Sequence, residues 1–131
     1  MKEIIGINHI GIRVTNLDST RVFYEQLGFK FIAGPMGPEP IAIMKHPSGV
    51  NLNLILNADT KTIKNILMDV TERYPGYTHV ALDVNDVKAV QEQLEKLDIH
   101  ITEGPITLPN GGVMLFIRDQ DNNVIEFHQN G

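Results

Sequence analysis

The order of apolar and polar positions along the chain predicts short strands and helices in a fixed succession. Residues 4–14 alternate between apolar and polar side chains, a period of two that is typical of a strand with one buried face. Apolar residues then recur at helical spacing over about residues 18–27 and end at Gly28, a residue suited to a helix C-terminus. Further strands are expected at 29–33, 41–45 and 51–56, with a turn-rich loop at 34–38.

The second half of the chain repeats this succession. GINHIGIRV at 6–14 returns as GYTHVALDV at 76–84, 70 residues later, and HPSGVNLNL at 46–54 returns as DQDNNVIEF at 119–127. The second copy is expected to form strands at 77–84, 99–102, 113–117 and 123–128, with a helix at 86–97. The sequence therefore predicts a duplicated βαβββ unit.

We expect a single domain over residues 1–131, with module one at 4–56, a connecting helix at 57–75 and module two at 76–128. The helix is predicted from the spacing of Ile63, Ile66, Leu67 and Val70. A four-stranded sheet with one helix leaves its other face open, so two such faces would enclose a cleft when paired. The pairing can occur within one chain or in a homodimer, and we expect a homodimer.

Composition narrows the classes of partner. The net charge is −5 without a basic cluster, and there is no Trp, so nucleic acid and anionic membranes are poor candidates. No apolar run approaches the roughly 18 residues of a membrane span, and the first residues lack the apolar core of a signal peptide. The absence of cysteine excludes disulfides and thiolate chemistry and favours a cytoplasmic protein. We expect its partner to be a small-molecule substrate.

A histidine occupies the same place in both copies, at His9 and His79. Strand alternation puts Gly11 on the face of His9 and Ala81 on the face of His79, and such small neighbours leave volume for a ligand. A lone strand histidine is more often a hydrogen-bonded packing residue than a ligand. Because the histidine is repeated, we favour a site built between the two copies.

A carboxylate, Glu126, stands among apolar residues in the last predicted strand. A buried carboxylate is costly to ionise unless it is paired, and a divalent cation would compensate its charge. The first copy has Asn53 at this place, a neutral oxygen donor that would be a weak fourth ligand or a supporting group. Two imidazoles and one carboxylate suit Zn, Ni, Mn, Co or Fe(II) and leave positions open for substrate. We therefore predict His9, His79 and Glu126 as metal ligands.

Four segments carry a family resemblance: INHIGIRV, FYEQLGF at 23–29, THVALDV and DQDNNVIEFHQ. Over about residues 5–128 the chain resembles the vicinal oxygen chelate superfamily, which includes glyoxalase I, extradiol dioxygenases, methylmalonyl-CoA epimerase, and fosfomycin-resistance and bleomycin-binding proteins. The resemblance implies an α+β fold in which two paired βαβββ modules form a U-shaped, partly open barrel-like sheet around a metal cleft. It also implies metal-ligand roles for His9, His79 and Glu126.

The resemblance further implies a divalent-metal-dependent, glyoxalase I-like lyase or isomerase. Such an enzyme would act on a small substrate with neighbouring oxygens through an enediolate-like intermediate, with Glu126 as ligand and proton-shuttling base. Glyoxalase I-like enzymes usually have Glu where this chain has Asn53, whereas epimerases tend to have a neutral Gln there. Two alternatives stay open: an extradiol-type ring-cleaving dioxygenase, and a non-catalytic protein that binds a small molecule such as a drug.

Overall fold

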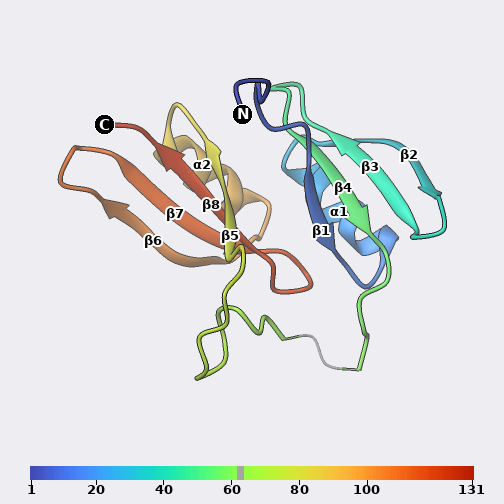
Figure 1. The fold of residues 1–131 in the computed structure, drawn as a ribbon. Coiled ribbons are helices and arrows are strands. Elements are labelled where there is room, and N and C mark those ends of the chain that lie inside the picture. The colour runs from blue at the N-terminus through green and yellow to red at the C-terminus, as the bar shows by residue number, and fades with distance from the viewer. Residues whose placement is uncertain (62–63) are drawn as a thin grey trace. The chain divides into compact units, whose positions relative to one another are not determined.

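The computed structural model describes residues 1–61 and 64–131 and divides into two compact units, Met1–Thr62 and Ile63–Gly131. Each unit holds a four-stranded mixed sheet and one helix in the chain order β-α-β-β-β (Figure 1). The predicted α+β class and the two βαβββ modules are thereby confirmed. Neither of the two helices in the described residues has the length and apolar character needed to span a membrane.

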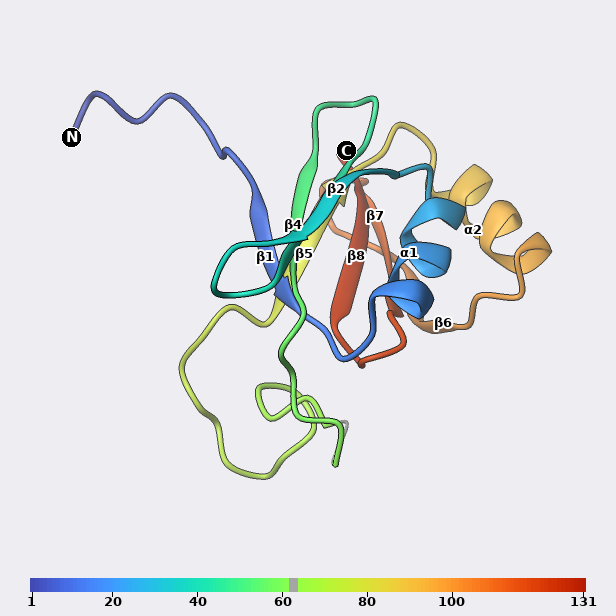
Figure 2. The same ribbon diagram turned by 90° about the vertical axis from the view of Figure 1, so that its right-hand side faces the viewer.

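Unit one carries the first copy of the repeat. Its elements are β1 (Ile10–Arg13), α1 (Leu17–Gln26), β2 (Lys30–Met36), β3 (Ile41–Lys45) and β4 (Asn51–Ile55). The sheet order is β1-β4-β3-β2, with β1 parallel to β4 and the other pairs antiparallel. The Asn16 side chain caps α1 by accepting from the amide of Ser19, and the helix lies on one face of its sheet (Figure 2).

Unit two repeats the arrangement. Its elements are β5 (His79–Asp83), α2 (Val87–Lys96), β6 (Ile101–Thr107), β7 (Val113–Arg118) and β8 (Val124–Gln129). The sheet order is β5-β8-β7-β6, and β5 runs parallel to β8. Asp86 caps α2 by accepting from the amide of Ala89, as Asn16 does for α1. The duplication seen in the sequence is therefore a duplication of topology and of helix capping.

In each unit the helix covers the apolar face of the sheet. Along β8, Ile125 and Phe127 are buried on the side of α2, while Glu126 points to the opposite face. The strands β1 and β5 alternate in the predicted sense, with their apolar residues less exposed than the polar or small residues between them. The face that carries the predicted ligands is thus the face that the helix leaves uncovered.

The edge strands β2 and β6 are longer than the sequence predicts. The strand β2 continues through Gly34-Pro35, which lies in the expected turn-rich loop, and β6 continues through Gly104-Pro105, which lies past the expected strand end. Both Gly-Pro peptide bonds are cis. The expected ends of these strands, residues 33 and 102, are therefore wrong. Proline is tolerated here because β2 and β6 lie at the edges of their sheets, where a missing amide donor costs little. The pairing shifts register in both strands.

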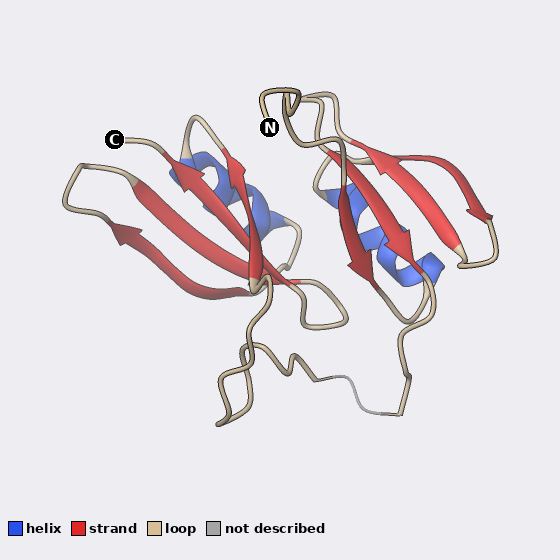
Figure 3. Ribbon diagram, viewed as in Figure 1, coloured by secondary structure: helices blue, strands red, loops and turns tan. Residues whose placement is uncertain are grey.

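The helix expected over residues 57–75 does not form in the part of that segment which the structure describes. Residues 57–61 and 64–75 consist of turns, bends and irregular loop, and Ile63 lies outside the described residues (Figure 3). The Asn65 side chain accepts from the amides of Leu67 and Met68 and closes a single turn there. Asparagine favours such local bonds over a continuing helix, which explains why the apolar spacing is misleading here.

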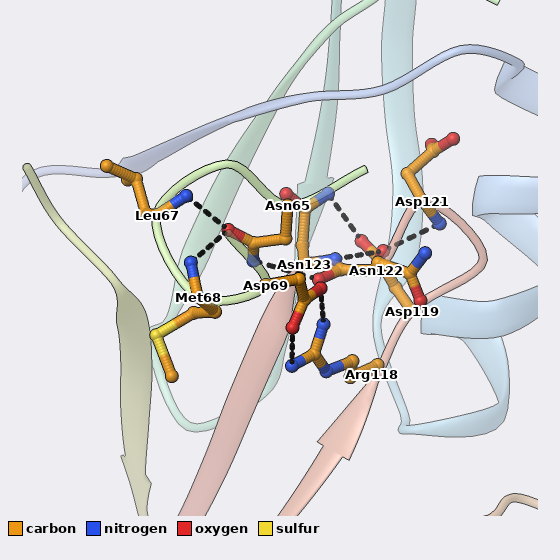
Figure 4. Close-up of polar contacts among 9 residues, drawn as sticks. All are labelled: Asn65, Leu67, Met68, Asp69, Arg118, Asp119, Asp121, Asn122 and Asn123. Carbon is orange, nitrogen blue, oxygen red and sulfur yellow. Dashed lines mark hydrogen bonds and ion pairs between the residues drawn. The ribbon is translucent and has the colours of Figure 1, made fainter. Parts of the chain in front are cut away.

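The part of this connecting segment that belongs to unit two makes polar contacts with the β7–β8 region of the same unit (Figure 4). Asp69 accepts two hydrogen bonds from the Arg118 guanidinium, at 2.5 and 2.9 Å, and the Asn65 amide donates to the carbonyl of Asn122 at 3.0 Å. The buried Asp119 carboxylate organises the adjoining β7–β8 turn by accepting from the amides of Asp121 and Asn123. The start of β8, which leads to Glu126, is therefore held by the connecting segment and by the β7–β8 turn.

Replacing Asp69 with asparagine is expected to remove a pH-dependent contribution to stability. The hydrogen bonds from Arg118 hold the pKa of the Asp69 carboxyl below its usual 3.8. A lowered folded-state pKa stabilises the fold above the unfolded pKa, and this stabilisation is lost as pH falls through the folded value. Urea titrations from neutral pH into the acid range should therefore show a shallower acid loss of unfolding free energy in D69N than in the wild type. Parallel profiles would contradict this assignment.

Candidate functional site

The site on unit two is set by the register between its two parallel strands. His79 opposes Val124, and Ala81 opposes Glu126. Residues that face each other across a sheet project from the same side, so His79, Ala81 and Glu126 share the face that α2 leaves open. Two positions 47 residues apart in the chain are thus brought together by one strand pairing.

A carboxylate between two imidazoles forms the centre of this site. The Nε2 atom of His79 lies 3.0 Å from Oε2 of Glu126, and Nδ1 of His128 lies 2.8 Å from Oε1. Glu126 is only 6% exposed, whereas the side chains of His79 and His128 are 37% and 26% exposed. The buried carboxylate is therefore paired at both oxygens, as a buried charge must be.

The other ring nitrogen of His79 is also held. Its Nδ1 lies 2.9 Å from the Thr78 hydroxyl, which can either donate or accept and so suits either tautomer of the ring. His9 has the equivalent contact in unit one, where Nδ1 lies 2.8 Å from Oδ1 of Asn8. Sequence reasoning missed both partners, although Asn8 and Thr78 also occupy equivalent places in the repeat.

Apolar side chains flank the centre on unit two. Phe116 opposes Glu126 on β7, and its ring meets the His79 ring edge-on with centroids 6.0 Å apart. Met114 opposes His128 on the same strand. These neighbours lower the local polarity and strengthen the interaction of Glu126 with any cation that approaches it.

The geometry suits a first-row divalent cation. Two donors at neighbouring positions around an octahedral ion, each at about 2.1 Å, lie about 3.0 Å apart. His79 Nε2 and Glu126 Oε2 have this separation, and both donor types suit Zn, Ni, Mn, Co or Fe(II). Across residues 1–61 and 64–131, no group of three or more His, Asp or Glu side chains is arranged to hold a metal ion. The described residues of unit two thus hold an ion pair of two side chains that are common metal ligands.

The predicted residues of unit one occupy the matching places. His9 is exposed and stands directly before β1, as His79 stands at the start of β5. Gly11 opposes Asn53 on β4, which reproduces the pairing of Ala81 with Glu126. The equivalence of Asn53 and Glu126 inferred from the sequence is thus the equivalence found in the two sheets. Asn53 is half-buried, with Ile43 opposite it where unit two has Phe116.

A second acid on the open face of unit two was missed from the sequence. Glu103 opposes Phe116, which in turn opposes Glu126, so all three side chains lie on one side of the sheet. The expected strand ended at residue 102 and therefore left Glu103 outside the sheet. Glu103 is exposed, unlike Glu126, and lies on the edge strand β6.

Comparison with known proteins identifies the family. Residues 6–127 match the Glyoxalase/Bleomycin resistance protein/Dioxygenase superfamily. The match runs through both βαβββ units, and the chain belongs to this superfamily. The resemblance drawn from INHIGIRV, FYEQLGF and the related segments is therefore confirmed at the level of the superfamily.

Solved structures with different activities share the fold. FosX, a fosfomycin resistance protein from Listeria monocytogenes, has a TM-score of 0.72 and 17% identity over 98% of this chain and 95% of its own. Lactoylglutathione lyase from Agrobacterium tumefaciens has a TM-score of 0.71 and 20% identity, covering 97% and 95%. TnmS3, an antibiotic binding protein from Streptomyces sp. CB03234, has a TM-score of 0.75 and 22% identity, covering 98% and 98%. These likenesses establish the fold and leave the activity open.

Proposed function

We propose that the protein is a divalent-metal-dependent enzyme of the glyoxalase type, a lyase or isomerase for a small substrate with neighbouring oxygens. The observation that carries this proposal is the pair formed by His79 and the buried Glu126, whose facing atoms are 3.0 Å apart. His9, at the repeat-equivalent position, is the proposed third ligand, supplied by the same chain or by a second copy. Asn53 is proposed to support the site or to ligate weakly.

Each residue of the proposed site has a chemical role. A bound divalent cation would stabilise negative charge that develops on the neighbouring oxygens of the substrate. Oε2 of Glu126, when it does not bind the cation, would take a proton from a substrate carbon and return it to the adjacent carbon, which leaves the carboxylate unchanged after each turnover. Gly11 and Ala81 would leave room for the substrate because neither side chain fills the space beside its histidine.

Related proteins give this proposal limited support. A mutant of FosX has been solved in complex with Mn(II) and 1S,2S-dihydroxypropylphosphonic acid, so a protein of this fold binds a divalent metal and a small molecule. Lactoylglutathione lyase shares the fold with this chain. The specific reaction proposed here rests on the residues of the chain itself.

A small-molecule binding protein is the second candidate. The observation that favours it is the neutral Asn53 at the place where unit two has Glu126, so the repeat carries only one carboxylate at these paired positions. TnmS3, an antibiotic binding protein, has the same fold. In this case the protein would bind its ligand with or without metal and would release it unchanged.

Substrate assays separate the candidate functions. The protein, purified without a histidine tag, is loaded separately with Zn, Ni, Mn and Co and mixed with the methylglyoxal–glutathione hemithioacetal. Metal-dependent isomerisation of the hemithioacetal supports the proposal. Oxygen uptake with catechols in the presence of Fe(II) would instead identify an extradiol-type dioxygenase, and ligand binding without turnover would identify a binding protein.

His79→Ala is expected to lower the metal-dependent activity by at least about 100-fold, since it removes a proposed ligand and the partner of Glu126. The matched control is His100→Ala, because His100 is an exposed histidine outside the site. Both variants are assayed at saturating metal after their thermal unfolding has been compared with the wild type. Full activity in H79A would rule out the proposed site.

A further inference from the structure

His128 contacts the same carboxylate as His79 but from the other side. It lies two residues after Glu126 on β8, so both side chains project from the open face of the sheet. The Nδ1 atom of His128 is 2.8 Å from Oε1, whereas His79 is directed at Oε2. The two oxygens of Glu126 are therefore divided between two imidazoles.

The direction of this hydrogen bond limits what Glu126 can do. An ionised carboxylate only accepts, so Nδ1 of His128 is the donor and Oε1 the acceptor. Because Glu126 is buried, its carboxylate exchanges this partner for water less readily than an exposed one would. Oε1 is thus occupied, and Oε2 is the oxygen that faces the ring of His79.

We propose that His128 is a positioning residue that restricts Glu126 to a single metal-binding oxygen, Oε2. This inference rests on the proposed metal site. Ca²⁺ is commonly bound by carboxylates through both oxygens, whereas first-row transition ions are well served by one oxygen and two imidazoles. By holding Oε1, His128 favours first-row ions over Ca²⁺ at this site.

His128 is not itself a ligand in this account. Its Nδ1 is directed at Oε1 of Glu126 and donates a hydrogen bond to that oxygen. A ligand role for Nδ1 would break the hydrogen bond that neutralises Oε1. His128 therefore affects cation binding indirectly, because it orients the Glu126 carboxylate.

Two substitutions separate these roles. His128→Phe keeps a planar ring and removes the donor, while His128→Asn keeps an N–H donor near the position of Nδ1. The control is His100→Phe, which makes the same change at an exposed position outside the site. Affinities for Mn²⁺, Co²⁺ and Ca²⁺ are measured by competition with a chelating dye, and the absorption spectrum of the Co²⁺-loaded protein reports the coordination.

We expect H128F to weaken Co²⁺ and Mn²⁺ binding by about 10–100-fold, to lose selectivity against Ca²⁺ and to change the Co²⁺ spectrum. H128N should keep most of the affinity and the wild-type spectrum, and H100F should match the wild type. Unchanged affinity and selectivity in H128F, with the wild type binding metal, would overturn this inference alone. If H128N loses as much metal affinity as E126Q does, His128 is a metal ligand, and the proposed positioning role is wrong. A wild type without affinity for any of these ions would overturn the proposed function itself.

Discussion

Glu126→Gln is expected to abolish metal-dependent activity and to weaken divalent-metal binding by more than the roughly 10–100-fold caused by losing an outer hydrogen-bond partner. The substitution keeps the shape of the side chain but removes the charge that faces His79 and His128. The proposed base is lost as well, a change that typically costs about 10²–10⁴-fold in rate. Competition titration and turnover of the hemithioacetal measure the two effects.

The matched control for this substitution is Glu92→Gln. Glu92 is an exposed glutamate on α2, and that helix covers the opposite face of the sheet. Its loss should leave metal affinity and activity unchanged. If E126Q binds metal as tightly as E92Q does, the buried carboxylate has a structural role and the proposed ligand set is wrong.

Gly104→Ala is expected to lower the free energy of unfolding by about 2–4 kcal/mol. Gly104 has a φ of +90°, and a Cβ atom there would lie 2.8 Å from the carbonyl oxygen of Met114 and 3.0 Å from Cα of Leu115. These are backbone atoms of the neighbouring strand, so they cannot move aside without disturbing the β6–β7 pairing. Urea unfolding of the variant measures the loss.

Gly49→Ala separates steric conflict from backbone strain. Gly49 has a comparable φ of +98°, but a Cβ atom there would meet nothing within 4 Å. Its substitution should cost only the strain of a left-handed conformation, about 1–2 kcal/mol. If G49A and G104A lose the same free energy of unfolding, the contact of the added Cβ atom with β7 does not explain the destabilisation of G104A.

Much of the fold could be predicted because the chain repeats itself. The recurrence of GINHIGIRV as GYTHVALDV predicted the two βαβββ units, and the end of the first helix at Gly28 and the strand alternation followed from local rules. The same recurrence assigned Asn53 and Glu126 to matching places, which the two sheet registers reproduce. The local sequence did not predict the length of β6, because Gly104-Pro105 is accommodated inside this strand by its position at the edge of the sheet.

The features of unit two that could not be predicted depend on contacts that the local sequence pattern does not specify. Asn65 and Asp69 belong to a stretch with helical spacing, yet their side chains bind the β7–β8 turn and Arg118. Glu103 joins the open face only because β6 continues past the expected end. The contact of His128 with Glu126 required a side-chain conformation that strand alternation permits but does not specify.

The central proposal is that His9, His79 and Glu126 bind one divalent cation, in a single chain or in a pair of copies, and the metal content of a His9→Ala variant tests it most directly. Wild type and variant are purified without a histidine tag, loaded with Ni or Zn, dialysed and submitted to elemental analysis. The account predicts about one ion per chain in the wild type and a marked loss in the variant, with thermal unfolding unchanged. Equal metal content in both proteins, or none in the wild type, would contradict it.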